Sequence, residues 1–440
     1  MSSAGLGTFH LGVANTLAHV GNDVKIAEED LPHGDMARSR RQRVRYDAVD
    51  GEGRRMARGA VTIIDVAQAA GVSKSAAARV LARNGSVSDK TRMKVLEAAA
   101  RLGYRPNHVA RAMKSGATNT IGIVVPDVAL PFFSAVLRGL ADTARAAGFE
   151  VLVSNTDNDA DIEARSLELL AEQRVDGVVI APVFQENPAA IVRLDREGMP
   201  IVLLDRRMPG LEHLPLVSLD HVDATERAIR SLIEGGHRRI ALVTEAAQVR
   251  STLESLTSRT SESSDLSLLR PSAQRFVGYL RALHRAGLEI DDELIIRSGY
   301  TTGDAQQAVE AFLDRDTGAT ALHATDAVLS SGAYRGIRAC GFSIPDDLSF
   351  IGFDDEDWTT MVQPAVTVVE QPRQRLGATA TTALVGIIRG GAAEPREQLL
   401  EAELVVRGSV AAASLPSHTL RCEPIRTGVS APSPSTSGRL

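Results

Sequence analysis

Basic side chains are concentrated in one short part of this 440-residue chain. Between Val61 and Lys114 there are ten Lys or Arg residues and three Asp or Glu residues, which gives a local net charge of +7. The whole chain has a net charge of −6, so the remaining residues sum to −13. Cationic side chains can neutralise DNA phosphates and donate hydrogen bonds to base edges. A basic segment on an acidic chain is therefore typical of a protein that holds nucleic acid with one part only.

The residues that can begin and end helices in this segment predict a helix-turn-helix. Thr62 and Asp65 have the spacing of a capping box, which begins a first helix. Gly71 tolerates the left-handed backbone that ends a helix, and Ser73 can cap a second helix two residues later. Two helices joined by so short a turn form the helix-turn-helix motif. The alternative is a solvated helix pair of an ordinary domain, which the local charge does not favour.

A third helix is predicted from Ser88 to Gly103. Its apolar residues are expected to cover the first two helices: Met93, Val95, Leu96, Ala99 and Leu102. Asn107 can cap one more short helix, His108 to Lys114, which has almost no apolar face. Because so short a helix is unstable in water, we expect it to form only against a partner subunit and DNA.

From Asn119 onward, short apolar runs alternate with amphipathic helical stretches such as Phe132 to Ala147 and Ile162 to Gln173. This alternation predicts parallel sheets with helices on both faces. A first series of four strands and a second series of four indicate two lobes. The predicted strands are Ile121–Val125, Val151–Val153, Gly177–Ile180 and Ile201–Leu204, then Ile240–Val243, Leu294–Ile296, Ala321–His323 and Leu348–Gly352.

Polar residues follow several of these strands. Open α/β sheets bind ligands at the carboxyl ends of their strands, which makes these residues candidates for a binding site. They are Asp127, Asp205 with Arg206, Thr325 with Asp326, and Asp354 with Asp355. Carboxylates and an arginine suit a polyol, because each makes two hydrogen bonds in a plane. Asp127, Asp205 and Asp354 have an alternative role as caps of the following helices.

From about Val61 to Arg407 the chain resembles the LacI/GalR family of bacterial repressors. The resemblance rests on motifs in a fixed order and spacing: Thr62-x-x-Asp65-Val66-Ala67-x-x-Ala70-Gly71-Val72-Ser73, Arg79-Val80-Leu81, Val87-Ser88-x-x-Thr91-Arg92 and Leu102-Gly103-Tyr104-x-Pro106-Asn107. It implies an N-terminal all-α helix-turn-helix headpiece and an α/β two-lobed domain like a periplasmic binding protein. It also implies that Lys74, Ser75 and Arg79 face the major groove, where Arg79 can grip a guanine. Met113 takes the place of a leucine that wedges into the minor groove.

The expected DNA-contacting residues are Thr62, Ser73, Lys74, Ser75, Ala76, Arg79, Asn84, Tyr104, Asn107, His108, Ala110 and Met113. The expected effector-binding residues are Asp127, Phe132, Asp205, Arg206, Arg275, Asp326, Asp354 and Trp358. The resemblance places Asp127 and Phe132 in a Pro-Asp…Pro-Phe-Phe signature, and it places Arg275 in the motif Arg275-Phe276-Val277-Gly278-Tyr279. Phe132 has an alternative role in the core, and Trp358 is either a ligand platform or a packing residue.

Three features depart from the family pattern. Ala76-Ala77-Ala78 stands where family members commonly have Thr-Val-Ser, so two hydroxyls that can contact DNA are missing. Thr325 replaces an asparagine that usually precedes Asp326, and Leu130 replaces another common asparagine. The pocket is therefore expected to be less polar than a standard sugar site.

The resemblance does not cover residues 1–60, which contain a basic run at 38–45. They are a DNA-touching arm, a disordered extension, or the product of a mis-assigned start, in which case Met56 is the true start. Residues 247–270 form a longer polar stretch than expected, either a lid or a disordered insertion. The expected organisation is a disordered extension or mis-assigned start (1–60), a helix-turn-helix DNA-binding domain (61–105), a hinge helix and linker (106–118), a two-lobed effector-binding and dimerisation domain (119–410), and a disordered tail (411–440).

Composition narrows the class of protein further. No run of about 18 to 20 apolar residues could span a bilayer, and the N-terminus lacks the pattern of a signal peptide. Cys340 and Cys422 are too few and too isolated for a metal site. We therefore expect a cytoplasmic protein that binds no metal, needs no cofactor and contacts no membrane.

The sequence favours a ligand-responsive transcriptional repressor that binds a palindromic operator as a homodimer or a dimer of dimers. The expected partners are double-stranded DNA and a small effector, a sugar or sugar derivative. A solute-binding transport protein would share the lobes but not the segment from Thr62 to Met113. An enzyme would need a convergent nucleophile or metal cluster, and the sequence offers no such spacing. The sequence leaves open whether the effector releases the DNA or strengthens its binding.

Overall fold

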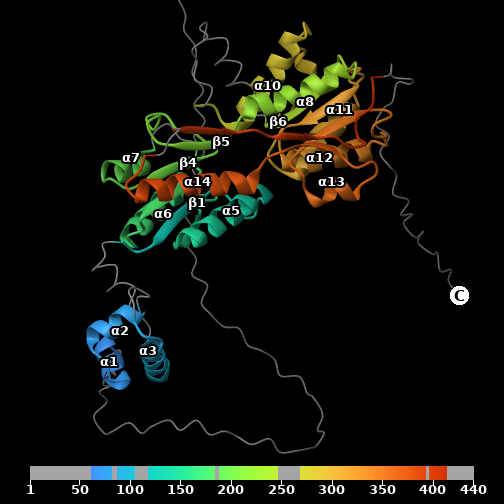
Figure 1. Cartoon of the computed structure of the whole chain (residues 1–440). Coiled ribbons are helices and arrows are strands. Elements are labelled where there is room, and N and C mark those ends of the chain that lie inside the picture. The colour runs from blue at the N-terminus through green and yellow to red at the C-terminus, as the bar shows by residue number, and fades with distance from the viewer. Residues whose placement is uncertain are drawn as a thin grey trace, which may run out of the picture.

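The structure, a computed structural model, describes residues 61–81, 87–104, 117–183, 188–245, 268–392 and 396–413 (Figure 1). These residues form a helical headpiece and two α/β lobes. The expectations for residues 1–60, for the short helix His108 to Lys114, for most of the polar stretch 247–270 and for most of the tail lie outside the described residues.

The first two helices of the headpiece begin and end as predicted. Helix α1 is Ile63–Ala70 and helix α2 is Lys74–Leu81. The Thr62 amide donates to Asp65 Oδ2 at 2.7 Å and the Asp65 amide donates to Thr62 Oγ1 at 3.4 Å, which confirms the capping box. Gly71 ends α1 with a φ of 63°, and Ser73 Oγ accepts a hydrogen bond from the Ala76 amide at 3.2 Å.

The third helix, α3 (Asp89–Leu102), begins after Ser88 and ends at Gly103, as predicted. Its buried residues are Val95, Ala98 and Ala99, which pack with the apolar side chains of α1 and α2. Met93 and Leu96 are 66% and 47% exposed, so the expectation that they cover the first two helices is wrong. At 3.6 residues per turn, positions 95, 98, 99 and 102 share one face and positions 93 and 96 point away from it.

The N lobe is built on a six-stranded sheet with the order β11-β5-β4-β3-β1-β2, in which every recorded pairing is parallel. Its strands are β1 (Thr120–Val125), β2 (Glu150–Asn155), β3 (Gly177–Ile180), β4 (Ile201–Leu204), β5 (Leu216–Leu219) and β11 (Glu397–Leu400). Its helices are α5 (Pro131–Ala147), α6 (Ala160–Glu172), α7 (Ala189–Arg196) and α14 (Arg373–Ile388).

The C lobe repeats this arrangement with the strand order β12-β10-β9-β8-β6-β7, and only β12 is antiparallel to its neighbour. Its strands are β6 (Ile240–Glu245), β7 (Ile295–Ser298), β8 (Ala321–Ala324), β9 (Ser349–Phe353), β10 (Thr367–Glu370) and β12 (Glu403–Val405). Its helices are α8 (His221–Glu234), α10 (Pro271–Arg285), α11 (Thr302–Leu313), α12 (Ala327–Ala339) and α13 (Asp357–Met361), with a short 3-10 turn at Asp292–Leu294.

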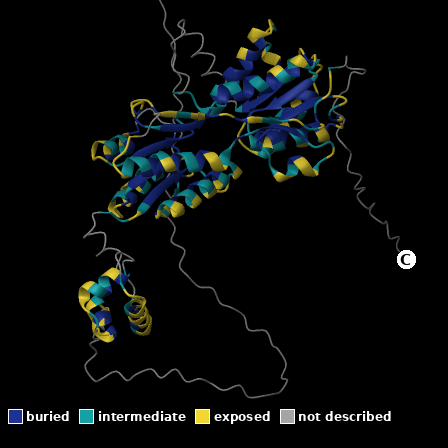
Figure 2. Cartoon of the chain, in the orientation of Figure 1, coloured by how far each residue is buried: buried dark blue, intermediate teal, exposed yellow. Residues whose placement is uncertain are grey.

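Each sheet lies between two layers of helices, and Figure 2 shows the buried strands inside and the exposed faces of the helices outside. Apolar clusters fill both faces of each sheet. The chain passes between the lobes three times, from β5 to α8, from β10 to α14 and from β11 to β12. All eight predicted strands are present, whereas β5, β10, β11 and β12 were not predicted. Three of these four strands adjoin a passage between the lobes on their carboxyl side, so the missed strands matter for the site.

Candidate functional site

The described part of the headpiece presents a polar, cationic surface on α2. Lys74, Ser75 and Arg79 are exposed, while Ala77 and Val80 of the same helix are buried against α1 and α3. Arg79 Nε donates to the Ser75 carbonyl at 3.4 Å, along the helix surface. Among the described residues, no carboxylate forms an ion pair with Lys74 or Arg79. Both cations can therefore meet an external anion or acceptor.

The other residues expected to contact DNA fall into two groups. Thr62 and Ser73 are exposed, and Ala76 and Tyr104 are partly exposed. The remaining expected residues lie outside the described residues: Asn84, Asn107, His108, Ala110 and Met113.

A cavity of about 490 Å³ lies where the carboxyl ends of the strands of both lobes meet. Seven of the eight expected effector residues line it: Asp127, Phe132, Asp205, Arg206, Arg275, Asp326 and Asp354. The lining also includes Leu130, Asp157, Asn158, Glu245, Arg270, Tyr300, Thr325 and Gln371. The cavity thus draws polar side chains from both lobes, as the rule for open sheets predicts.

Trp358 is the expected residue that the structure does not bring to the cavity. It lies on α13, where its ring centroid is 5.3 Å from that of Tyr334 and where it packs against the apolar core of the C lobe. Of the two alternatives for Trp358, its position fits the packing residue.

The residues that cap the helices test whether Asp127, Asp205 and Asp354 serve as helix caps. The N-cap residues of α5, α8 and α13 are Leu130, Asp220 and Glu356, so Asp127, Asp205 and Asp354 cap none of these helices. Asp127 Oδ1 instead accepts from the Ala129 amide at 2.9 Å. It is Asp326 that caps a helix, because its Oδ1 accepts from the Val328 amide at the start of α12.

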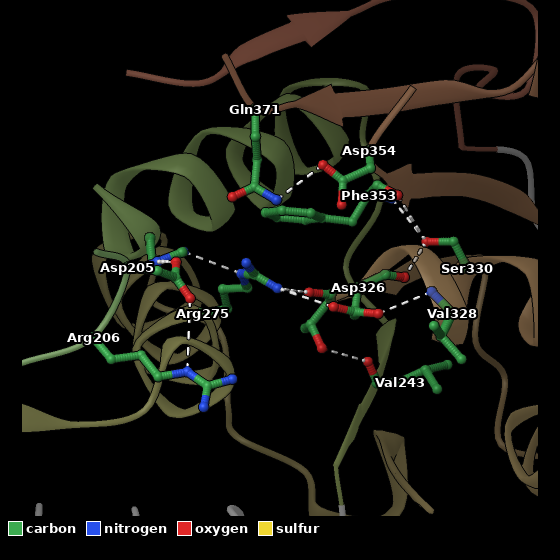
Figure 3. Close-up of polar contacts among 12 residues, drawn as sticks. Asp205, Arg206, Val243, Arg275, Asp326, Val328, Ser330, Phe353, Asp354 and Gln371 are labelled. Atoms are coloured by element: carbon green, nitrogen blue, oxygen red, sulfur yellow. Dashed lines mark hydrogen bonds and ion pairs between the residues drawn. The ribbon is translucent and has the colours of Figure 1, made fainter. Parts of the chain in front are cut away.

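Arg275 lies at the centre of the polar cluster, between Asp205 and Asp326 (Figure 3). Arg275 is only 5% exposed. The guanidinium carbon is 4.1 Å from the centre of the Phe353 ring, a cation–π contact. Nη1 donates to the Thr325 carbonyl at 2.7 Å and lies 3.6 Å from Asp326 Oδ2. These contacts hold the guanidinium of α10 against the ends of β8 and β9.

Two residues at the passages between the lobes complete the cluster. His221, the first residue of α8, has Nε2 at 3.2 Å from Asp205 Oδ1 and accepts at Nδ1 from Arg275 Nε at 3.3 Å. Gln371, which follows β10, donates from Nε2 to Asp354 Oδ1 at 2.9 Å. Neither residue was predicted, because the strands that precede them, β5 and β10, were not predicted. A polar residue at the carboxyl end of each strand is the signal that would have found them.

The buried carboxyl groups have different pKa values. Burial alone would raise the pKa of Asp205, but the hydrogen bond from His221 and the charges around it bring that pKa below its usual value. Burial raises the pKa of Asp354 to about 7, against the opposing charge of Arg373. Burial also raises the pKa of Asp326, and Arg275 opposes this shift. At neutral pH the cavity therefore offers both an ionised carboxylate and a carboxyl group that can donate a proton in a hydrogen bond.

The described residues contain no group of three or more His, Cys, Asp or Glu side chains placed to hold a metal ion. Within those same residues, no helix is long and apolar enough to cross a membrane.

Two family descriptions match separate parts of the chain. Residues 62–107 match the family described as bacterial regulatory proteins, lacI family. Residues 118–407 match the family described as periplasmic binding proteins and sugar binding domain of LacI family.

Curated relatives align over most of the chain. Catabolite control protein A of Priestia megaterium is 34% identical over 322 residues, which are 73% of this chain and 90% of that protein. The HTH-type transcriptional repressor CytR of Escherichia coli is 31% identical over 354 residues, which are 80% of this chain and 97% of that protein.

Two solved structures align with about four fifths of this chain. A lac repressor dimer bound to operator and the anti-inducer ONPF is 26% identical, with a TM-score of 0.67, and the alignment covers 80% of this chain and 100% of that chain. A complex of the transcriptional regulator CelR with cellobiose is 29% identical, with a TM-score of 0.57, and covers 79% of this chain and 99% of that chain.

Proposed function

The chain belongs to the lacI family of bacterial transcriptional regulators, and on that premise we propose that it is an effector-controlled repressor of a palindromic operator. The family consists of DNA-binding regulators rather than enzymes. The chain is therefore expected to act by binding DNA and an effector. We assign DNA binding to residues 61–105, the hinge to 106–118 and effector binding with dimerisation to 119–410, in the cytoplasm.

The observation that carries the DNA half of the proposal is the exposed face of α2. Lys74, Ser75 and Arg79 lie on the solvent side of a helix whose other side packs in the headpiece core. A second helix of a helix-turn-helix that projects such side chains fits the major groove, where arginine pairs with guanine O6 and N7. The alanines at 76 to 78 keep the helix and remove hydroxyl contacts, so this operator differs from those of better-known relatives.

Dimerisation follows from the need to place two headpieces on one palindrome. The N lobe has an apolar surface suited to a second copy at its edge strand β2, where Leu152 and Val153 are 40% and 50% exposed. A two-fold contact at one patch gives a dimer, and a further contact between dimers would give a dimer of dimers.

The interlobe cavity supports a small polyhydroxylated effector, a sugar or sugar derivative. Its lining combines hydrogen-bond acceptors and donors with the aromatic ring of Phe132 and the apolar side chain of Leu130. The buried Oε1 of Gln371 has no hydrogen-bond partner among the described residues, so it can accept from an effector hydroxyl. Thr325 keeps its hydroxyl bonded to the Val243 carbonyl at 3.1 Å, so it replaces the usual asparagine without offering its donor to the ligand.

Effector binding would control DNA affinity through the relation between the lobes. A ligand that contacts both lobes favours one relative arrangement, and the three chain passages transmit that choice to the dimer surface and the hinge. A coupling of about 1 to 3 kcal/mol would change operator affinity several-fold to about a hundredfold.

A gel-shift experiment with the full chain tests the DNA half. Wild type is expected to retard a palindrome from upstream of its own gene or a neighbouring gene, and Arg79→Ala is expected to lose about 1 to 3 kcal/mol of specific binding. Arg138→Ala removes the same charge from an exposed site on α5 and should bind as wild type does. If wild type prefers no such palindrome over unrelated DNA, the repressor proposal fails.

A thermal-shift screen of sugars and nucleosides, with cellobiose in the panel, tests the effector half. A true effector present at about 100 times its Kd stabilises the native protein by about 2.7 kcal/mol. Arg275→Ala should abolish the shift, whereas Trp358→Phe should leave it unchanged because Trp358 lies away from the cavity. Absence of any shift across the panel would contradict the carbohydrate assignment.

A further inference from the structure

His221 stands between two groups of fixed and opposite hydrogen-bonding character. On one side Asp205, after β4 of the N lobe, presents Oδ1 at 3.2 Å from His221 Nε2. On the other side Arg275, on α10 of the C lobe, directs Nε to His221 Nδ1 at 3.3 Å. The imidazole is completely buried. It is therefore a direct bridge between a residue of one lobe and a residue of the other.

The bridge admits one protonation state of the imidazole. An ionised aspartate only accepts hydrogen bonds and an arginine only donates them. The middle residue must therefore donate toward Asp205 and accept from Arg275, which requires neutral histidine with its proton on Nε2. Ser218 fits this assignment, since its hydroxyl donates to the Asp205 carbonyl at 3.1 Å and leaves its lone pairs toward Nε2 at 3.5 Å.

We propose that His221 is a positioning residue, whose single neutral tautomer ties Asp205 of the N lobe to the guanidinium of Arg275 and holds that guanidinium ready for the effector. The inference rests on the proposed function of the cavity, which Arg275 lines. His221 itself is not among the residues that line the cavity, so it acts through Arg275. Its position at the passage from β5 to α8 means that movement between the lobes must strain or break the bridge.

The charged groups around His221 favour the neutral form. Burial and the positive charge of Arg275 on α10 lower its pKa, while Asp205 after β4 and Asp220 beside it oppose that shift, and the net direction is downward. An imidazolium would place a second cation against Arg275 and would lose the acceptor at Nδ1. The bridge is therefore intact at neutral pH, and protonation of the imidazole in acid breaks it.

NMR spectroscopy of the ligand-free full chain, labelled with ¹⁵N in arginine and histidine, tests the bridge at about pH 7.5, where the imidazole is neutral. The imidazole resonances that His221→Gln removes should report a proton on Nε2 and a bare Nδ1. A protonated Nδ1 or an imidazolium at this pH would overturn the proposal. This measurement uses wild-type protein and does not depend on whether a variant folds.

The Arg275 Nε–H signal, identified by its loss in Arg275→Lys, tests the positioning role. Glutamine can donate and accept like neutral histidine, so His221→Gln should keep the signal. Leucine can do neither, so His221→Leu should speed its exchange with solvent about tenfold or more, which corresponds to about 1.4 kcal/mol. His284→Gln and His284→Leu, at an exposed position on α10, are the matched controls and should leave it unchanged.

An Arg275 signal whose exchange is the same in His221→Leu as in wild type would overturn the proposal, and so would a folded His221→Gln that behaves like His221→Leu. Neither readout needs an effector or an operator. Failure of the sugar screen would therefore leave the bridge intact, and failure of the bridge would leave operator binding and the sugar screen unaffected.

Discussion

The two lobes repeat one backbone arrangement around two aspartates. Asp205 follows β4 and Asp354 follows β9, and these two strands occupy the same place, third in the spatial order, in their sheets. The amide of each donates to the neighbouring strand at 2.8 Å, to Val217 and Val369, and each residue has a φ of 64°. Left-handed backbone is uncommon for residues other than glycine, and aspartate is one of those that tolerate it. The repeated geometry directs a carboxyl group from each lobe into the cavity.

The charge states of these two carboxyl groups nevertheless differ. Asp205 faces His221 and Arg206, and its pKa lies below the usual value in spite of burial. Burial raises the pKa of Asp354 to about 7; the carboxyl group of Asp326 adds to this rise, whereas Arg373 and the hydrogen bond from the Gln371 amide oppose it. The difference teaches that backbone repeats fix where a side chain points, whereas neighbours from other strands and helices fix its chemistry.

The helix pairs beside the two sheets test whether the lobes are equivalent in packing. A Cβ added at Gly139 of α5 would lie 1.9 Å from the carbonyl oxygen of Gln374 on α14, and one at Gly278 of α10 would lie 2.3 Å from that of Val222 on α8. Gly139→Ala and Gly278→Ala should each cost more than about 3 kcal/mol, because backbone on both sides must move. Urea unfolding monitored by circular dichroism measures the loss.

Gly386→Ala on α14 is the control for these two variants, since a Cβ there meets no atom within 4 Å. In a helix this change should stabilise by up to about 1 kcal/mol. A loss of stability in only one of the two close-packed variants would show that the helix pairs are not equivalent.

Asp205→Asn tests the ionised member of the aspartate pair. The change keeps the shape of the side chain and removes the charge that faces His221 and lies 3.8 Å from Arg206 Nε. Removal of one partner from a buried charged cluster should cost about 3 kcal/mol at neutral pH. The free energy of unfolding from urea titration is the measure, and a stability equal to wild type would contradict the assignment of a buried carboxylate.

Asp354→Asn should raise the stability of the native protein at alkaline pH, the opposite of the effect expected for Asp205→Asn. With its pKa raised to about 7, the native carboxyl group holds a proton that the unfolded chain has already lost, so wild type loses stability as pH rises toward and through that value. Between about pH 5.5 and 8 this amounts to about 2 kcal/mol for one carboxyl group. The variant should lack this loss, and unfolding at several pH values measures it. If Asp205→Asn and Asp354→Asn have the same pH dependence, the contrast between the lobes is wrong.

The sequence was sufficient where neighbours in the chain determine the structure. The capping box of Thr62 and Asp65 and the strand ends at Asp205 and Asp354 are local patterns, and they predicted the headpiece and most of the cavity lining. His221 and Gln371 were not predicted, because they follow strands β5 and β10, which were not predicted, and their partners, 16 and 17 residues distant, meet them only through strand pairing. Met93 was wrongly expected to face the first two helices, and two roles were left open for Trp358. In both cases residue type alone does not tell which face of a helix is covered.

Thr325 offers the smallest difference between the lobes. At the end of β8 the amide of Thr325 donates a hydrogen bond to the carbonyl of Val243. At the end of β3 the amide of Ala181 donates in the same way to the carbonyl of Val124. Only the C lobe adds a side-chain hydrogen bond here, from Thr325 Oγ1 to the same Val243 carbonyl at 3.1 Å. Thr325→Val keeps the shape and removes this bond, so it should cost about 1 kcal/mol, measured by urea unfolding. Thr382→Val, at an exposed hydroxyl on α14, should change little. If Thr325→Val loses no more stability than Thr382→Val, the hydroxyl of Thr325 contributes nothing beyond what Ala181 provides at the same place in the N lobe.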